Sequence, residues 1–359
     1  MRKAIGRVGL AAASVVLALA FGECGVRAAG IAPTRYHRPH HVENADKSAA
    51  VDAYPTDPRH YFDVDLRDAT TRARLGALGL DVVKVSRWTP HAVEFHYNAH
   101  RCRDRDMAPN PAPGVTRILM LGDSFTEGQG VREDDTFSRR LERELRAAGR
   151  DVEVLDCGRR GRDFPALWDA FEELVDAYHP NVVVYAMVLN DAVQSDAFRA
   201  RQEFLNDWIL DRRRMLGDDD PGGDVPGPRL WALFRDRMES RRVARATTRW
   251  YLDMYGTENA DGWTATQGYI AKMRERMEGR FLVALLPLLV KGNPYPFAAP
   301  AAEIRRACGA SNVSFVDLES AVAGVDPETL WVHAVDMHPN ERAHALFAES
   351  LRDPVLSKL

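Results

Sequence analysis

A serine follows a short apolar run at a position where it could act as a nucleophile. The run Ile118–Leu121 is followed by Gly122, Asp123 and Ser124. An apolar run of this kind predicts a buried parallel strand, and open α/β sheets bind ligands at the carboxyl ends of such strands. A helix from about Phe125 onward would place its N-terminus nearby and stabilise negative charge. Ser124 is therefore a candidate nucleophile that needs a base and an oxyanion hole.

A candidate base lies near the end of the chain, in the segment Val335–His344. His338 could take the proton of Ser124 if a carboxylate held its ring in the required tautomer. Asp336 precedes His338 by two residues, so a loop could bring its carboxylate to the imidazole. Such a pair is common on surface loops, and it indicates a catalytic role only in combination with Ser124.

Two further apolar runs end in residues that could stabilise an oxyanion. One run begins at Val152 and leads into a turn with Gly161, and the next ends in Asn190. The backbone N–H groups of Ser124 and Gly161 and the amide of Asn190 could form an oxyanion hole. Each such preorganised donor contributes about 3 kcal/mol to transition-state stabilisation. Gly161 alone could be a turn glycine and Asn190 a helix cap, but their order at strand ends favours a shared site.

Together these residues resemble the SGNH (GDSL-type) hydrolase family, in a secreted bacterial branch to which the lead-in Asn98–Asp104 is also similar. The matching blocks, which run from Thr116 to Leu351, are Gly122-Asp123-Ser124 for the nucleophile, Gly161 and Asn190-Asp191 for the oxyanion hole, and Asp336 with His338 at the end. The resemblance implies a flavodoxin-like three-layer α/β sandwich. It also implies serine-dependent cleavage or transfer of acyl esters, without a metal or cofactor.

The chain departs from the family pattern at several positions. Asp156 stands where asparagine is usual, Val188 replaces a glycine, and Asp336 is two rather than three residues before His338. Basic residues also flank Gly161, at positions 159, 160 and 162. They could favour an acidic substrate, but a solvated basic turn is the commoner explanation. Two other histidines, at positions 333 and 344, are rival bases that we expect to be structural.

The rest of the sequence organises the chain around this site. Strand-like runs at 281–287 and 313–318 alternate with helical segments, which predicts right-handed crossovers and a central five-stranded parallel sheet. The hydrolase domain would then span 113–359, with a helical insertion at 192–262. This insertion follows Asn190 directly, so it is either a lid over the cleft or a helical hairpin on the surface.

The N-terminal part predicts export followed by a linker. Arg2, Lys3 and Arg7 precede the apolar run Val8–Gly22, so residues 1–29 indicate a signal peptide, with an uncleaved membrane anchor as the alternative. We expect a flexible tether at 30–57 and a small accessory β segment at 58–112. The protein would be secreted, periplasmic or in the cell envelope, with membrane attachment through this N-terminal segment as an option.

Composition limits the function classes further. The chain has 359 residues, 45% hydrophobic and 28% charged, with a formal net charge of −4. Such a chain can bury a sizeable core, and its charge predicts no nucleic-acid partner. Beyond Cys24 there are three cysteines, Cys102, Cys157 and Cys308. We expect buried free thiols, with a Cys102–Cys157 disulfide as the alternative, and the absence of a Cys-x-x-Cys pair argues against zinc.

These features predict a serine hydrolase of carboxylic esters. His338, oriented by Asp336, would deprotonate Ser124 for attack on the ester of a small molecule or glycan, and water would resolve the acyl-enzyme. Two alternatives remain: a cell-envelope polysaccharide O-acetyltransferase or deacetylase using the same site, and an envelope binding protein that has lost turnover.

Overall fold

The structure is a computed structural model of the chain, and it describes residues 2–31, 53–56, 91–94, 97–200, 227–333 and 336–359. The chain forms two compact units. One comprises Met1–His37 with Asp196–Trp250, and the other comprises Arg38–Ser195 with Tyr251–Leu359. The predicted lid concerns the relation between the two units and stays a prediction.

The larger unit is built on a five-stranded parallel sheet in the order β4-β3-β5-β6-β7. The strands are β3 (Thr116–Gly122), β4 (Val152–Gly158), β5 (Val182–Met187), β6 (Phe281–Leu285) and β7 (Ser314–Asp317). The first three are apolar almost throughout and buried, as expected of strands that are covered on both faces. The predicted α/β fold with a central sheet of five parallel strands is confirmed.

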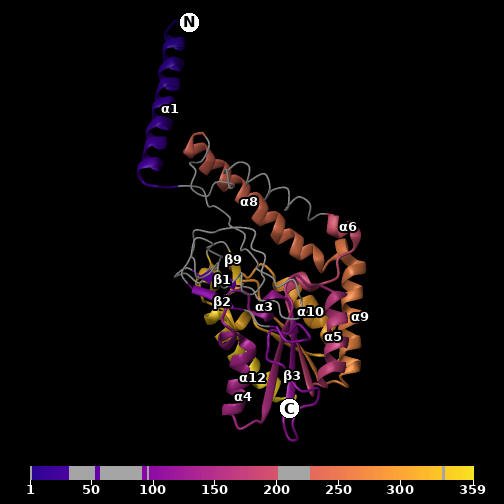
Figure 1. Cartoon of the computed structure of the whole chain (residues 1–359). Helices are drawn as coiled ribbons and strands as arrows, with labels where there is room; N and C mark the ends of the chain where they lie inside the picture. Colours follow the sequence, from indigo (N-terminus) through magenta and orange to yellow (C-terminus); the bar gives the residue numbers. More distant parts are fainter. Residues whose placement is uncertain (1, 32–52, 57–90, 95–96, 201–226, 334–335) are drawn as a thin grey trace. The chain divides into compact units, whose positions relative to one another are not determined.

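Helices cover both faces of this sheet (Figure 1). Alternate side chains of each strand point to opposite faces, so both faces need a covering layer to be buried. On one face, Ile118 and Met120 of β3 belong to a core that includes side chains of α4 (Phe137–Ala147) and α12 (Glu341–Leu356). The other face is covered by α5 (Ala166–Tyr178), α9 (Ala260–Arg276) and α10 (Ala298–Ala310). The three layers predicted from the sequence are therefore present.

The helix α4 shows how sequence fixes one of these layers. Thr136 accepts a hydrogen bond from the backbone N–H of Arg139 at the start of the helix, as an N-cap residue does. Phe137, Leu141 and Leu145 follow at intervals of four and are fully buried, so they form one apolar stripe. This stripe packs against α12 and the sheet.

A small antiparallel sheet precedes the larger one. It pairs β1 (Ala53–Thr56) with β2 (His91–Glu94). β2 lies in the accessory β segment predicted at 58–112, whereas β1 falls within the stretch predicted to be a flexible tether, so at least these four residues form regular structure. Residues 58–90 of the accessory segment and most of the tether lie outside the described residues.

The smaller unit is helical. It contains α1 (Arg2–Ala28), the short α6 (Asp196–Arg199) and most of α8 (Arg229–Met254). α6 and α8 lie in the helical insertion predicted at 192–262, and residues 201–226 of that insertion lie outside the described residues. In the described part of the chain, α1 alone is long and apolar enough to cross a membrane, over Gly9–Ala28, a property that a signal sequence shares.

Candidate active site

The candidate nucleophile lies on a sharp turn where β3 ends. Ser124 begins the one-turn helix α3 (Ser124–Glu127), and Asp123 caps it by accepting a hydrogen bond from the N–H of Phe125 at 2.9 Å. Only glycine fits at position 122, because an added Cβ would lie 2.6 Å from the carbonyl oxygen of Ala186 on β5. The helix predicted after the serine is therefore present but short, and the sheet itself fixes the turn.

The candidate base meets the serine in the folded chain. The Nε2 atom of His338 lies 2.8 Å from the Oγ of Ser124, although the two residues are 214 positions apart. The imidazole also packs edge-on against the ring of Phe125, with centroids 5.3 Å apart. A serine within hydrogen-bonding distance of a histidine is the geometry required for activation of the hydroxyl.

The segment that carries His338 is a short hairpin rather than the predicted loop. β8 (Trp331–His333) pairs with β9 (Asp336–Pro339) in antiparallel fashion, with a register shift between Trp331 and His333. Asn340 fastens the end of the hairpin, because its side-chain amide donates to the carbonyls of Thr329 and Trp331. The strand pairing and the hydrogen bonds of Asn340 hold the histidine where the sequence predicted a loop.

The predicted acid is the least defined part of the site. Asp336 is the first residue of β9, but its side chain, like that of His333, lies outside the described residues, so its role stays a prediction. The side chain that the structure does place at the Nδ1 atom of His338 is Gln129, at 3.4 Å. Gln129 was not predicted. Its only sequence signal is its position one turn after Ser124, whose carbonyl accepts its backbone N–H.

The two predicted oxyanion residues lie at the ends of neighbouring strands. The side-chain amide of Asn190, in a short helical turn after β5, donates to Asp123 at 3.2 Å, so it lies beside the nucleophile turn. Gly158 at the end of β4 pairs in register with Gly122, so the turn that carries Gly161 begins next to Ser124. Gly161 has a φ of +67°, which favours glycine.

Two buried carboxyl groups lie beneath this turn. Burial raises the pKa of Asp123 above its usual range, although the N–H of Phe125 and the amide of Asn190 oppose the shift. Burial and the nearby charge of Asp123 raise the pKa of Asp191 still further. Asp191 accepts hydrogen bonds from the hydroxyl of Tyr185 and the N–H of Val188, both at 2.9 Å. These contacts make Asp191 a brace for the strand end that carries Asn190.

A disulfide and a buried arginine attach the lead-in segment to the nucleophile turn. Cys102 and Cys157 are disulfide-bonded, so the expectation of free thiols is wrong for these two residues, and the alternative holds. The adjacent Arg103 is fully buried and donates to the carbonyls of Glu127, Gly128 and Val131 at 2.6–2.8 Å. The lead-in therefore supports the loop that carries Gln129.

The arginines near Gly161 have protein partners. The guanidinium of Arg160 lies 2.5 Å from a carboxylate oxygen of the buried Glu127, which also accepts the hydroxyl of Tyr97. Arg159 donates to the carbonyl of His100 and pairs with Glu173. The expectation of a solvated basic turn is therefore wrong for these two arginines, because both hold the turn to neighbouring segments.

Two other titratable groups are buried close by. Burial raises the pKa of Asp156 to about 7, against the opposing effects of Arg103 and Ser138. Burial lowers the pKa of His344 to about 3, and its Nδ1 accepts the N–H of Phe137. His344 is thus a neutral packing residue, as expected of the rival base on the closing helix.

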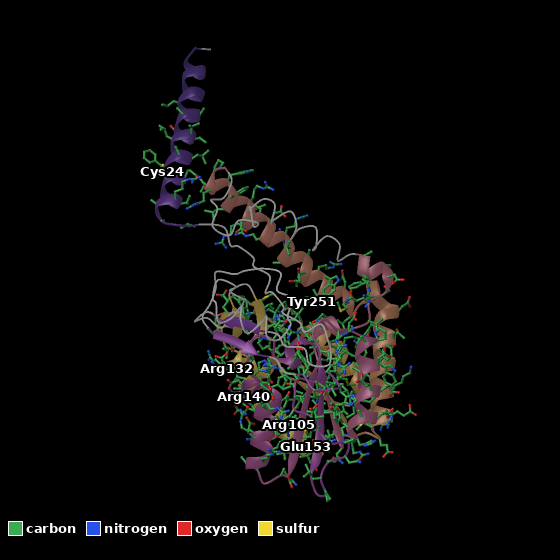
Figure 2. The ribbon with its side chains drawn as sticks, viewed as in Figure 1. Cys24, Arg105, Arg132, Arg140, Glu153 and Tyr251 are labelled. Carbon is green, nitrogen blue, oxygen red and sulfur yellow. A yellow bond between two sulfur atoms is a disulfide. The ribbon has the colours of Figure 1, made fainter. Side chains whose placement is uncertain are left out.

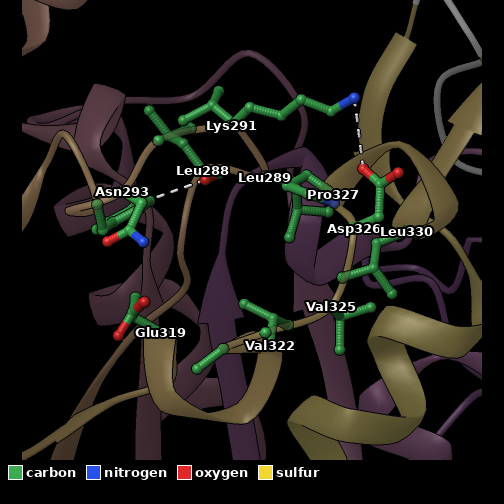
Figure 3. Close-up of a pocket in the computed structure, with 15 residues that line it drawn as sticks. Leu288, Leu289, Lys291, Asn293, Glu319, Val322, Val325, Asp326, Pro327 and Leu330 are labelled. Carbon is green, nitrogen blue, oxygen red and sulfur yellow. Dashed lines mark hydrogen bonds and ion pairs between the residues drawn. The ribbon is translucent and has the colours of Figure 1, made fainter.

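A separate cavity opens beyond the end of β6 (Figure 3). It has a volume of about 670 Å³ and is lined mainly by Leu288–Asn293 and by residues 322–327. Lys291 at its rim pairs with Asp326 and Glu328. Neither Ser124 nor His338 lines it. Across the described ranges, no group of three or more His, Cys, Asp or Glu residues is arranged to hold a metal ion.

The fold and the site define an α/β protein with a Ser–His pair at the carboxyl edge of a parallel sheet. The chain belongs to the GDSL-like lipase/acylhydrolase family, whose model matches residues 120–346 and so spans every residue of the site. It is accordingly an enzyme that hydrolyses ester bonds. A comparison with curated proteins gave no match.

Solved structures similar to this chain include hydrolases of low sequence identity. TesA is 16% identical, with a TM-score of 0.42 over 68% of this chain and 100% of that chain. A catalytic mutant of the acetylxylan esterase Axe2 from Geobacillus stearothermophilus is 12% identical, with a TM-score of 0.40 over 67% and 94%. The lipase/acylhydrolase from Enterococcus faecalis is 14% identical, with a TM-score of 0.39 over 68% and 97%. The family assignment rests on the family model.

Proposed function

We propose that this enzyme cleaves carboxylic esters by nucleophilic catalysis, with Ser124 as nucleophile and His338 as general base. The observation that carries the proposal is the distance of 2.8 Å between the Oγ of Ser124 and the Nε2 of His338. At this distance the imidazole can take the hydroxyl proton as the oxygen attacks the ester carbonyl. His338 then returns the proton to the leaving alcohol, and water repeats the cycle on the acyl-enzyme.

The tetrahedral oxyanion would be stabilised by three donors: the N–H groups of Ser124 and Gly161 and the side chain of Asn190. The support for this assignment is positional, since all three follow the carboxyl ends of adjacent strands. Such donors act strongly because the protein holds them in place before charge develops. Asp123 lies behind the turn and is already engaged by Phe125 and Asn190, so it braces the nucleophile rather than reacting.

The imidazolium formed in the first step needs a partner at Nδ1. Asp336 is the proposed acid, because it precedes His338 by two residues on the same strand. Gln129, which is 3.4 Å from Nδ1, would hold the ring in place with it. Asp336, by accepting the Nδ1 proton, would fix the tautomer that leaves Nε2 free to accept the serine proton, while the amide nitrogen of Gln129 contacts the same edge of the ring.

The substrate is a small-molecule or glycan acyl ester, and the enzyme acts outside the cytoplasmic membrane. Two observations support that location. The helix α1 begins with basic residues and continues as the apolar span Gly9–Ala28, as in a signal sequence or anchor. The Cys102–Cys157 disulfide belongs to an oxidising compartment. The protein would therefore be secreted, periplasmic or held in the cell envelope.

The test is hydrolysis of p-nitrophenyl acetate, butyrate and octanoate by the purified full-length chain and by Ser124→Ala. Ser320→Ala is the matched control, because Ser320 is exposed and remote from the site in sequence. We expect activity in the wild type and the control, and its loss in Ser124→Ala. Undiminished activity in Ser124→Ala would overturn the proposal. If no ester is cleaved by any form, an acyl donor with a glycan acceptor distinguishes transfer from hydrolysis.

A further inference from the structure

The first half of α8 exposes an apolar stripe that the catalytic account does not use. Trp231, Phe234 and Met238 are 58%, 55% and 49% exposed. Their spacing of three and four residues puts them on one side of the helix, and the rings of Trp231 and Phe234 stack with centroids 5.5 Å apart. Large apolar side chains gathered on a surface mark a site of contact with a membrane or another protein.

The start of α8 is joined to the apolar helix α1 within the same unit. The carboxylate of Glu23 accepts the backbone N–H groups of Arg229 and Leu230, both at 2.8 Å. Arg27 pairs with Glu23 and donates to the carbonyl of Gly227. The first N–H groups of a helix lack partners inside it, and a carboxylate that accepts them stabilises the helix. α1 therefore completes the structure of α8, a role that a removed signal peptide cannot have.

The charged residues of α1 indicate the depth in a membrane at which α8 would begin. The stretch from Val8 to Gly22 carries no charge, and it is bounded by Arg7 on one side and Glu23 on the other. If the span Gly9–Ala28 crosses the bilayer, Glu23 and Arg27 lie in its last two turns, near the boundary between hydrocarbon and water. The basic N-terminus favours the cytoplasmic side, so α8 begins at the outer boundary. Trp and Phe side chains favour this depth of a membrane.

The charges of α8 identify the surface that fits the stripe. The same side of the helix continues with Arg241, Arg242, Arg245 and Arg249, all exposed. These positions follow Met238 at helical spacing, so the exposed side changes from apolar to basic along its length. A helix with apolar side chains beside a row of arginines suits a membrane interface with anionic headgroups. A second copy docking through the same side would bring like charges together.

We propose that α1 is a permanent membrane anchor and that the first half of α8 docks onto the anionic outer surface of the same membrane. Trp231, Phe234 and Met238 enter the boundary between headgroups and acyl chains, and the arginines beyond them contact lipid phosphates. Glu23 sets the register between the two helices. This surface is independent of the ester-hydrolase proposal, since it involves none of the site residues.

The test measures the depth of a nitroxide label on the full-length chain in lipid nanodiscs. The label is placed at Met238→Cys in a Cys24→Ala background, because Cys24 is the exposed free cysteine (Figure 2). The matched control is Ala244→Cys, which is exposed on another side of the same helix. In discs of phosphatidylcholine with phosphatidylglycerol, we expect the label at position 238 to contact oxygen and to be shielded from a water-soluble nickel chelate. The label at position 244 should show the reverse.

Substitution of the arginines provides the second part of the test. The double substitution Arg241→Gln with Arg245→Gln should lower the ratio of membrane-docked to free α8 by about tenfold or more. The unsubstituted protein in discs of phosphatidylcholine alone should show a similar loss of docking. Circular dichroism and thermal unfolding of each variant verify folding. The mass of the protein isolated from the envelope should include residues 1–28.

Several outcomes would overturn the proposal. Equal nickel accessibility at positions 238 and 244 would mean that the stripe does not meet the bilayer. Shielding that is the same in both lipids and in the arginine variant would exclude anionic lipid as the partner. Dipolar coupling between labels on two chains would assign the stripe to a second copy. A mature protein that lacks residues 1–28 would exclude the anchor.

Discussion

The two sides of the candidate site are built in different ways. The nucleophile side lies at the end of β3, which pairs with β4 and β5, and its turn is held by Asp123 and by Arg103. The histidine side is a hairpin of two short strands with a register shift, fastened by Asn340. One side is part of the core of the domain, whereas the other is attached to it.

This difference predicts how each side responds to change. A substitution beneath Ser124 disturbs the sheet and the lead-in, so stability and activity should fall together. The histidine hairpin is anchored by the buried Val332 and Asn340, but a substitution at its exposed or half-buried positions leaves these contacts in place, and local openings of such small elements require little free energy. Activity should then fall with little loss of stability. Substitutions on the two sides test this contrast.

The largest effect is expected from the Ser–His pair itself. Ser124→Ala and His338→Ala should each lower kcat/KM by about 10³-fold or more, because each removes a member of a unit that acts together. The double variant should be little worse than either single variant. Thermal unfolding should stay near that of the wild type. A double variant whose loss reaches the product of the two single losses would contradict the joint role.

Loss of the disulfide should be the largest effect on the stability of the nucleophile side. Cys102→Ser should lower the free energy of unfolding by about 2–4 kcal/mol. It should also lower kcat, because Arg103 would no longer be held at the loop after Ser124. Urea unfolding and ester hydrolysis measure the two effects, with Cys24→Ser as the exposed control. Full activity with reduced stability would separate the lead-in from the site.

A glycine on the neighbouring strand provides a steric test. In Gly158→Ala the new Cβ would lie 2.1 Å from the backbone nitrogen of Glu127, so the strand or α3 must move. Such overpacking lowers stability by about 1–3 kcal/mol, and kcat should fall with it. Gly309→Ala is the control, since nothing lies within 4 Å of its added Cβ. Unchanged kcat in Gly158→Ala would mean that the nucleophile turn tolerates displacement.

Stability on the nucleophile side should depend on the protonation of Asp156. Its pKa is raised in the folded state to about 7, so between about pH 4 and 7 the folded chain binds a proton that the unfolded chain has lost. Stability contributed by this group is therefore lost as the pH rises towards 7. Asp156→Asn should reduce the decline in the unfolding free energy between about pH 4 and 7. An identical decline in the wild type and the variant would contradict this assignment.

The smallest effect is expected at Gln129, which lies on the loop after Ser124 and contacts the histidine across the site. Gln129→Leu keeps the volume but removes the polar contact at Nδ1 of His338. We expect kcat to fall by up to about tenfold, with KM and thermal stability nearly unchanged. Gln129→Asn should not restore the rate, because it is shorter. A shift of KM alone would assign Gln129 to substrate binding.

The sequence predicts the sheet side well for a physical reason. Buried parallel strands are continuous apolar runs, and the residues that follow them must meet at one edge of the sheet. The residue order alone therefore indicates Ser124, Gly161 and Asn190 together with the strands that carry them. Helical periodicity likewise indicates the helical insertion at 192–262, within which α8 lies.

The remaining features depend on contacts between residues that are far apart in the sequence. The hairpin of His338 consists of strands too short to show a pattern. The partners of Arg103 and Gln129 are mostly backbone carbonyls or single side-chain atoms, which leave no trace in residue spacing. The Cys102–Cys157 pairing was one of two alternatives, because cysteine counts do not fix distance. The contact of Glu23 with α8 joins residues 206 positions apart, and no local signal marks it.

The central claim is that Ser124 is a nucleophile activated by His338. The most direct test is treatment of the full-length protein with a fluorophosphonate, followed by mass spectrometry of the peptides. We expect a phosphonyl group on the Oγ of Ser124, with loss of fluoride and transfer of the hydroxyl proton to His338, and much slower labelling in His338→Ala. A folded protein that stays unlabelled, or that is labelled at another residue, would contradict the claim.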